Sequence, residues 1–396
     1  MPSRRRFIAA VSGATLVAGC GSSPTADRPP TPSDPSFDPT RHVAGADGEW
    51  SSFGCNASNT REVHDGRAPV DGLSERWRVA IPSLQQRAPV VAGGRVFLPG
   101  PQGLRVFDAE DGSSLWRAPA VERPPLVRDG TAYVADGDAD ALRALDAASG
   151  DERWAVPVDG EPAAPSMYPG RPLVFGVGET VHAVDPETRE TVWTRDVFGE
   201  VLGHAPVFMG HSVVAATTAG EVSLLRLDDG HGVRRWRLPA TPVAPPSADT
   251  DSVYVSCRDG TTYALGDDSA PRGGVLWTAD TGWAERGIAV AAGQVVVADG
   301  STLTAVDAES GETRWTHGMG DWRHTAPCYG RDTLFVGGDR LWALDPTPSG
   351  GAGPAVRFER SFAGRVGPGP VVDDGRLYVV AETAPDTHHL LAFDGT

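Results

Sequence analysis

A repeat of about forty residues runs through most of this 396-residue chain and constrains its fold more than any other feature. The clearest copies read LRVFDAEDGSSLW, LRALDAASGDERW, VHAVDPETRETVW and LTAVDAESGETRW. Weaker copies end at Trp236, Trp277 and Phe358, and these terminal residues, which we call anchors, follow Trp77 at intervals of 38 to 43 residues. Two further alternating apolar runs precede each copy, so each repeat supplies four short strands. The repeat therefore predicts an all-β, eight-bladed β-propeller with four-stranded blades.

The two ends of the repeat region complement each other. The last copy, LLAFDGT, stops without an anchor strand, whereas Trp77 lies in an anchor strand that no copy precedes. We expect strand 74–81 to complete the eighth blade begun by residues 370–394, which closes the ring and removes its free sheet edges. The propeller then spans residues 74–396, and residues 48–73 pack against an end of the ring.

An aspartate opens the turn between the third and fourth strands of the clearest repeats. In such turns the Asp carboxylate accepts backbone N–H groups and a Gly adopts a positive φ. The abundance of Gly (48) and Pro (34) also fits short strands joined by tight turns. We interpret four aspartates as turn residues rather than catalytic groups: Asp108, Asp146, Asp185 and Asp307.

The charge composition excludes several chemistries. The chain has 52 acidic and 35 basic residues, a net charge of −17, and every basic residue is arginine. Without lysine it cannot hold a P-loop, kinase or Schiff-base lysine. The negative charge repels nucleic acid, so we expect no nucleic-acid partner. Such an acidic surface, with Arg as the only strong base, resembles the proteins of extreme halophiles and predicts a halophilic archaeal source.

The first 47 residues look like targeting segments. Three arginines precede an uncharged stretch (7–19) that is too short to span a bilayer, which predicts a signal peptide over residues 1–20. The order Ser-Arg-Arg-x-Phe-Ile resembles a twin-arginine export signal, and Val-Ala-Gly-Cys resembles a lipobox ending at Cys20. Residues 21–47, dense in Pro, Ser and Asp, predict a disordered tether. A frayed basic tail is the alternative.

The repeat also carries a family resemblance over about residues 48–396. The motif Ala-x-Asp-x-x-Thr/Ser-Gly-x-x-x-Trp resembles the tryptophan-docking repeat of pyrroloquinoline quinone (PQQ) type propellers, and Trp50, Phe53 and Thr60 resemble the segment that often begins them. This family contains PQQ-dependent dehydrogenases and non-catalytic members, among them the scaffold lipoprotein of the bacterial outer-membrane barrel-assembly machine. The resemblance implies a fold and leaves the function open.

A dehydrogenase of this family would have a vicinal Cys pair over the cofactor, a calcium ion held by acidic and amide side chains, and an Asp base. The cysteines of this chain, Cys20, Cys55, Cys257 and Cys328, include no adjacent pair. We therefore expect no catalytic residue, metal or cofactor, and keep PQQ with calcium as the alternative. Cys257 and Cys328 lie in strands of non-adjacent repeats, and we expect buried free thiols there rather than a disulfide.

The starts of the innermost strands form one end of the channel, which we call the mouth, and we expect ligands to bind there. Basic groups gather at the position before each innermost strand, with Arg323, His324 and Arg365 close by. The eight positions are Arg87, Arg123, Ala164, His204, Ala244, Arg286, Thr325 and Pro368. Because guanidinium groups bind carboxylate or phosphate bidentately, the mouth is predicted to bind an anionic ligand or acidic peptide. Alternatively, the arginines only neutralise neighbouring Asp and Glu.

Two tryptophans outside the anchor set, Trp283 and Trp322, occupy equivalent positions on adjacent blades. We expect both to face the mouth beside Arg286, Arg323 and His324. Exposed rings there would stack on a planar cofactor, a sugar ring or a partner's side chain. Packing within the loops is the alternative.

Three weaker motifs have plainer explanations. The acidic run 136–140 resembles the start of a calcium loop, but Ala141 replaces the glycine of that motif and an acidic hairpin fits better. His388 and His389 are adjacent, so on a strand they face opposite sides and are unsuited to one metal. Asn56 begins an Asn-Ala-Ser glycosylation sequon of low specificity.

Together these features predict an exported, monomeric, non-catalytic propeller that is lipid-anchored through Cys20 on the extracellular face of the cytoplasmic membrane. Its expected partner is a protein or a small anionic ligand at the cell surface, bound at the mouth. A PQQ-dependent oxidoreductase is the first alternative, and a carbohydrate-binding surface protein that uses Trp283 and Trp322 is the second.

Overall fold

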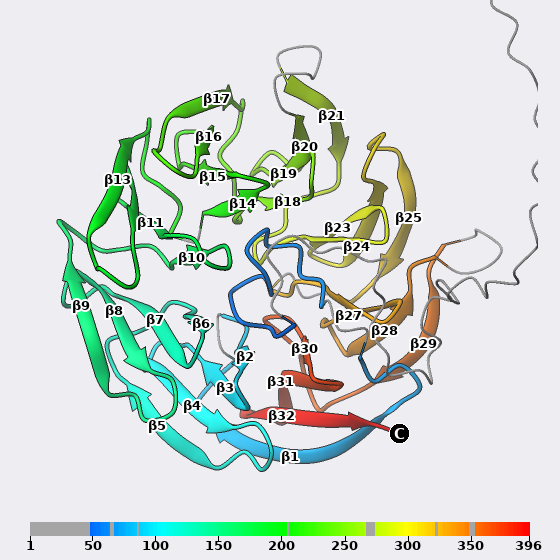
Figure 1. The fold of residues 1–396 in the computed structure, drawn as a ribbon. Coiled ribbons are helices and arrows are strands. Elements are labelled where there is room, and N and C mark those ends of the chain that lie inside the picture. Colours follow the sequence, from blue (N-terminus) through cyan, green and yellow to red (C-terminus); the bar gives the residue numbers. More distant parts are fainter. Residues whose placement is uncertain are drawn as a thin grey trace, which may run out of the picture.

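The computed structural model describes residues 48–63, 67–84, 87–203, 206–266, 274–320, 324–347 and 353–396. Within these ranges the chain forms eight four-stranded sheets around a central axis (Figure 1). The predicted all-β, eight-bladed propeller with four-stranded blades is thereby confirmed. The predicted signal peptide (1–20), its Cys20 and the predicted tether (21–47) lie outside the described residues. No helix within the described ranges has the length and apolar character needed to cross a bilayer.

In blades 1 to 7 the strands follow the chain from the axis outward. Blade 1 comprises β2 (Val90–Ala92), β3 (Arg95–Leu98), β4 (Leu104–Asp108) and β5 (Ser114–Ala118), and blade 2 comprises β6 (Leu126–Arg128), β7 (Thr131–Asp136), β8 (Ala141–Asp146) and β9 (Glu152–Pro157). Blade 3 comprises β10 (Ser166–Met167), β11 (Leu173–Val177), β12 (Thr180–Val184) and β13 (Thr191–Asp196), and blade 4 comprises β14 (Val207–Met209), β15 (Ser212–Ala216), β16 (Glu221–Arg226) and β17 (Gly232–Arg237). Blade 5 comprises β18 (Ser247–Ala248), β19 (Ser252–Ser256), β20 (Thr261–Gly266) and β21 (Val275–Asp280). Blade 6 comprises β22 (Ala289–Ala291), β23 (Gln294–Asp299), β24 (Thr302–Asp307) and β25 (Thr313–Gly318). Blade 7 comprises β26 (Cys328–Gly330), β27 (Thr333–Val336), β28 (Leu341–Asp345) and β29 (Ala355–Arg360). Blade 8 has the order β30 (Val371–Asp373), β31 (Arg376–Ala384), β32 (Thr387–Gly395) and β1 (Leu73–Ile81).

Burial along each blade falls from the axis to the rim. The innermost strands are buried at every residue, whereas the outermost strand β13 buries only Trp193. Apolar side chains on both faces of the inner strands pack against the neighbouring blades, so the core is divided among the seams between blades.

The anchor tryptophans join each blade to the next. The indole N–H groups of Trp77, Trp116, Trp193, Trp277 and Trp315 each donate to a carbonyl in the turn of the following blade, at 2.7–3.1 Å. The turn glycines have positive φ, and a Cβ on Gly112, Gly150, Gly230 or Gly311 would lie only 2.5–2.8 Å from the ring of the preceding anchor. Each indole ring therefore leaves no room for a side chain at the turn residue that it covers, and this residue must be glycine. The predicted packing of anchors between blades is confirmed.

The four turn aspartates act as predicted. Oδ1 of Asp146 accepts the N–H groups of Ala148 and Ser149 at 2.9 and 3.0 Å. A hydrogen bond from Arg153, together with these N–H groups, holds the pKa of Asp146 at about 2. Asp108, Asp185 and Asp307 accept backbone N–H groups in the same way. These carboxylates stabilise the turns.

Blade 4 departs from the repeat. In the other blades the aromatic anchor pairs with the residue just before a β-bulge, as Trp315 pairs with Ala305. In blade 4 that register position belongs to Arg234, which pairs with Leu224, and Trp236 lies two residues farther along the strand. Trp236 is therefore out of register with the other anchors, but it still packs against the next blade, where a Cβ on Gly274 would lie 2.5 Å from its Nε1. Arg226 stands where the clear copies have the turn Asp, so both ends of the docking motif have changed here.

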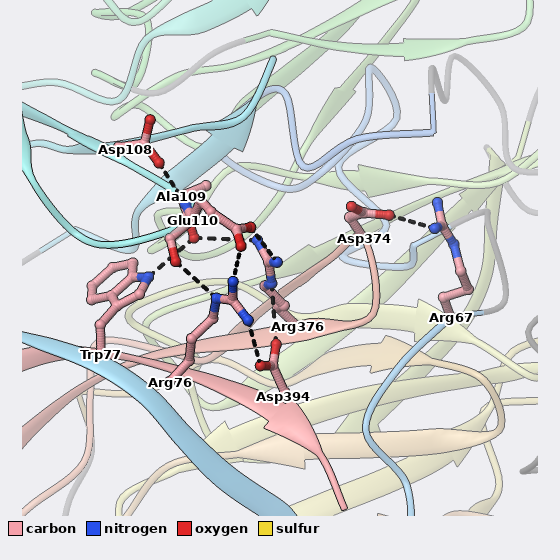
Figure 2. A network of polar contacts seen from close by, with 9 residues as sticks. All are labelled: Arg67, Arg76, Trp77, Asp108, Ala109, Glu110, Asp374, Arg376 and Asp394. Atoms are coloured by element: carbon pink, nitrogen blue, oxygen red, sulfur yellow. Dashed lines mark hydrogen bonds and ion pairs between the residues drawn. The ribbon is translucent and has the colours of Figure 1, made fainter.

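The N-terminal strand closes the ring as predicted. β1 pairs with β32 along its length, and Trp77 Nε1 donates to the carbonyl of Ala109 in blade 1. Figure 2 shows the ionic contacts that surround this junction. Arg376 lies 2.6 Å from Glu110 and 3.1 Å from Asp394, and Arg76 pairs with the same two carboxylates. Two arginines and two acids thus connect β1, the turn after β4 in blade 1, and strands β31 and β32 of blade 8.

Candidate functional site: the mouth and its floor

The mouth brings together three of the predicted arginines. Arg87, Arg123 and Arg286 precede the innermost strands of blades 1, 2 and 6. Burial, together with the positive charges of Arg286 and Arg123, lowers the pKa of Arg87 to about 10, while Glu122 opposes them. The charges of Arg286 and Arg123 therefore lie close enough to act on Arg87 at this end of the channel.

Acidic residues share the side of the mouth formed by blades 1 to 3. Arg123 Nη1 donates to the carbonyl of Gly203 at 2.6 Å, and its Nη2 pairs with Glu161. A cavity of about 150 Å³ lies here, lined in part by Arg87, Glu122, Arg123 and Glu161. The cavity offers guanidinium donors next to carboxylates, so an anionic ligand would compete with Glu161 for Arg123.

A second cluster lies beside blade 6. His324 Nδ1 lies 2.6 Å from Glu285 Oε2, and Arg286 Nη2 lies 3.4 Å from the same imidazole nitrogen. Burial lowers the pKa of Arg286, while Glu285 raises it. The structure therefore contains both features that the sequence left open, a gathering of basic groups and carboxylates that partly neutralise them.

Several predicted site residues lie elsewhere or outside the described chain. His204, Trp322 and Arg323 are outside the described residues. Trp283 is half-buried, and the guanidinium carbon of Arg258 lies 5.9 Å from its ring centroid. Ala164, Ala244, Thr325 and Pro368 are buried ring positions without charge.

The sequence predicts that residues 48–73 pack against an end of the ring, and it did not anticipate that residues 50–63 fill the channel below the mouth. We call residues 50–63 the plug; Figure 1 shows it as the blue trace near the centre of the ring. Its carbonyls accept backbone N–H groups from the innermost strands of six blades at 2.8–2.9 Å, and the donors are Val91, Val127, Phe208, Ala248, Val290 and Tyr329. The backbone N–H of Trp50 donates to Asp373 Oδ1 in blade 8 at 2.8 Å, so seven of the eight blades bond to the plug. The plug therefore forms an innermost layer that ties the blades together.

Arg61 is the most unusual residue of the plug because its side chain is completely buried. Its Nε donates to the carbonyl of Pro327 at 2.7 Å, its Nη1 donates to that of Phe53 at 3.3 Å, and its guanidinium lies 5.2 Å from the Trp50 ring centroid. Burial lowers its pKa to about 10. A Cβ on Gly287, the neighbour of Arg286, would lie 3.7–4.0 Å from Arg61 and Phe53. The plug thus forms the floor of the mouth.

The chain reaches the plug from the face opposite the mouth. Innermost strands begin at the mouth, so the turns that follow β2 and β30 lie on the other face. The N–H of Gly93 in the first turn donates to Glu49 at 2.8 Å, and Arg67 pairs with Asp374 in the second turn (Figure 2). Glu49 and Arg67, which flank the plug, therefore both lie on that face.

The sequon asparagine lies inside the plug. Asn56 is 3% exposed, its Nδ2 donates to Thr60 Oγ1 at 2.6 Å, and its Oδ1 accepts from the N–H of Ser58 at 3.1 Å. A glycan on Nδ2 would displace these contacts, so the folded protein does not present Asn56 for glycosylation. Cys55 in the same segment is also buried, and its thiol donates to the carbonyl of Glu62 at 3.2 Å.

The described residues do not fit the cofactor that some members of the fold family use. Cys257 and Cys328 are buried free thiols, as predicted, and burial raises the pKa of each to about 12, while Cys55 is also buried. Within the described ranges no three His, Cys, Asp or Glu side chains gather as a metal site would require. A planar quinone on the axis would also have to displace Trp50 and Arg61, which are 0% exposed.

The two remaining motifs have structural contacts. Asp136 ends β7, and its carboxylate lies 2.6 Å from Arg143 in a β7–β8 hairpin. His389 Nδ1 lies 2.7 Å from Thr383 Oγ1, and His388 is the preceding residue of the same strand. Neither arrangement gathers metal ligands.

Comparison with known proteins places these features in a family. The profile of the family described as "Outer membrane protein assembly factor BamB" matches residues 70–178, 177–269, 268–350 and 301–396. The chain is 31% identical over 206 residues to the outer membrane protein assembly factor BamB of Alkalilimnicola ehrlichii, which covers 47% of this chain and 53% of that protein. It is 28% identical over 304 residues to the serine/threonine-protein kinase AfsK of Streptomyces griseus, covering 71% and 31%. The chain thus spans about half or less of the length of these curated relatives.

Solved structures share the fold at low identity. The crystal structure of BamB from Moraxella catarrhalis superposes with a TM-score of 0.61 at 16% identity, covering 82% of this chain and 98% of that one. Quinohemoprotein alcohol dehydrogenase from Comamonas testosteroni superposes with a TM-score of 0.67 at 14% identity, covering 88% and 81%. These likenesses show the propeller architecture alone.

Proposed function

Because the chain belongs to the family described as outer membrane protein assembly factor BamB, we propose that it is a non-catalytic scaffold propeller that binds an acidic partner segment or a small anionic ligand at its mouth. One observation carries the proposal: Arg87, Arg123 and Arg286 converge on the mouth of a chain whose net charge is −17. Concentrating partly buried positive charge at one end of an acidic protein favours an anion there.

We further propose that the protein is exported and held by lipid on Cys20 at the extracellular face of the cytoplasmic membrane. The twin arginines and the lipobox of residues 1–20 support this location. The name of the family refers to outer-membrane assembly, and we propose a scaffold role without that membrane. The lysine-free, acidic composition favours a halophilic archaeal source, and such cells have no outer membrane.

The alternatives have less support. A PQQ-dependent oxidoreductase needs a channel that the plug fills and a vicinal Cys pair that the chain lacks. A carbohydrate site on Trp283 has no specific observation in its favour, because that ring lies beside Arg258.

The mouth is tested with an anionic probe. Fluorescein-labelled decaglutamate should bind the wild-type chain, and the double variant Arg87→Ala with Arg286→Ala should bind it at least ten-fold more weakly, because it loses two of the three converging guanidinium groups. The measurement is fluorescence anisotropy over a salt series, since salt screens exposed charges. The matched control is Arg78→Ala with Arg117→Ala, which removes the same charge from the outermost strands β1 and β5. Equal loss of affinity in both double variants would mean that binding follows net charge and not the mouth.

A further inference from the structure

A groove on the wall of the propeller, between blades 3 and 4, is distinct from the mouth. In each blade, one residue of the third strand pairs with the residue that follows the anchor, and it faces the preceding blade. In blade 7 this residue is Trp342, which pairs with Glu359 and whose ring centroid lies 4.8 Å from that of His317 in blade 6. Five blades place a long or aromatic side chain there: Arg105, Arg143, His182, Tyr263 and Trp342. Blade 4 has Ser223, and beside it lies a cavity of about 290 Å³. We call this cavity the rim groove.

The inner end of the rim groove contains an unsatisfied carboxylate oxygen. The side chain of Glu221 is 3% exposed, and its Oε1 accepts from Ser223 Oγ at 3.1 Å and from the N–H of Phe198 at 3.2 Å. Its Oε2 has no hydrogen-bond partner in the described part of the chain, and Arg235 Nη1 is 3.7 Å away. A buried carboxylate oxygen without a hydrogen bond is costly, so this position favours a ligand that brings a donor, and a cationic donor most of all.

Apart from Glu221, the lining of the rim groove carries three arginines, Arg195, Arg234 and Arg235, and one acid, Asp196. The guanidinium of Arg195 in blade 3 lies over Gly232 at the edge of blade 4. A Cβ built on Gly232 would be 3.3 Å from Arg195 Nη2. Arg235 is 70% exposed on the other wall. Its strand, β17, carries three arginines and no acid, whereas each of the other seven outermost strands, all described, carries at most two arginines. These two guanidinium groups favour a carboxylate at the open side.

Apolar side chains complete the lining. Leu225 is buried in the groove wall, and Val233 is 42% exposed at its edge. They provide surface for a short aliphatic group between the acceptor at the inner end and the guanidinium groups at the open side.

From this arrangement we propose that the rim groove binds a small zwitterion of the aliphatic α-amino acid type. Its ammonium group donates to Glu221 Oε2, its carboxylate lies between Arg195 and Arg235, and its side chain contacts Leu225 and Val233. The site shares no residue with the mouth, so it is a second function that does not depend on the first.

The ligand class is tested by calorimetric titration of the full chain in molar KCl with three compounds of one carbon skeleton. L-Leucine carries both charged groups, 4-methylpentanoate lacks the ammonium group, and 3-methylbutylamine lacks the carboxylate. We expect L-leucine to bind saturably and the other two at least ten-fold more weakly. Absence of saturable heat with L-leucine would overturn the proposal. Equal affinity for 4-methylpentanoate would also overturn it, because the site would then recognise only an anion.

Variants locate the binding. Ser223→Tyr introduces the residue that blade 5 has at this position and should abolish L-leucine binding by filling the groove. Glu221→Gln removes the buried charge without changing the size of the side chain and should weaken binding at least ten-fold. The matched control is Arg117→Ala, since Arg117 pairs with Arg105 as Arg235 pairs with Ser223. Arg235→Ala should weaken binding and Arg117→Ala should not. Binding that survives both Ser223→Tyr and Glu221→Gln would place it outside the groove and refute the proposal. The mouth double variant should leave L-leucine binding intact, so failure of one proposal is distinguishable from failure of the other.

Discussion

The plug and the mouth lie next to each other on the axis of the propeller, but opposite kinds of interaction build them. The plug is held by backbone hydrogen bonds to the innermost strands, and its largest side chains, Trp50 and Arg61, are completely buried. The mouth is built from partly exposed charged groups whose main contacts are with one another, as in the cluster of Glu285, Arg286 and His324. The plug therefore stabilises the ring, whereas the mouth is where we propose that binding takes place.

The largest expected effect is on the plug. Trp50→Ala removes a side chain that is 0% exposed and should lower the free energy of unfolding by about 3–5 kcal/mol, the usual cost of truncating a buried aromatic residue. The measurement is denaturant unfolding in molar KCl. A loss below about 1 kcal/mol would show that the plug is only loosely attached to the ring.

Cysteine labelling supplies an internal control for that variant. Cys55 lies in the plug and Cys328 lies in β26 against it, whereas Cys257 lies in blade 5. In a Cys20→Ser background, alkylation of Cys55 and Cys328 should accelerate in Trp50→Ala more than alkylation of Cys257. Uniform acceleration of all three would mean that the whole ring opens and not the plug alone.

Lowering the pH is expected to have an intermediate effect on the stability of the fold. This effect should arise from residues between the blades and not from residues on the axis. Burial lowers the pKa of His182, which stacks on Phe175, and of His317, which packs against Trp342. Between the lowered value and the ordinary pKa of about 6.5, the unfolded chain binds protons that the folded chain does not. Stability should therefore fall as the pH drops from 7 towards 5, and thermal melting should show it. His182→Phe with His317→Phe should flatten this dependence; an unchanged slope would place its origin elsewhere.

The smallest effect on stability is expected at the mouth. Arg87→Ala with Arg286→Ala removes hydrogen-bonding groups but also relieves the burial and mutual repulsion that lower the pKa of Arg87. The net change in the free energy of unfolding should be below about 1 kcal/mol in either direction. A loss comparable to that of Trp50→Ala would mean that these arginines serve the fold, as the structural alternative holds.

The sequence predicts those features of the fold that recur in every repeat. The blade count, the closing strand 74–81, the turn aspartates and most anchors followed from comparing copies, because each copy must satisfy the same turn and the same contact with its neighbour. Blade 4 escaped this comparison, since Trp236 was the only aromatic residue near the expected position and the change to Arg234 appears only in strand register.

The site was less accessible to sequence reasoning. The ring alignment did select arginines that meet at the mouth, but the plug has a single copy and no periodicity. Its partners are distant in the chain; Arg61, for example, contacts Pro327. The rim groove depends on Ser223 being small next to Arg195 of another blade, a juxtaposition that no local pattern reveals.

The central claim is that the plug closes the axis and confines recognition of the anionic ligand to the mouth. Thermal melting of the full chain in molar KCl, with and without PQQ plus calcium, tests it most directly, because a ligand of the native state raises stability by RT ln(1 + [L]/Kd). Because PQQ carries carboxylates that the mouth arginines can bind, the decisive sample is the Arg87→Ala, Arg286→Ala variant, for which we predict an unchanged melting temperature across a concentration series. A saturable upward shift in that variant would contradict the account, since it would require a cofactor site where Trp50 and Arg61 now lie.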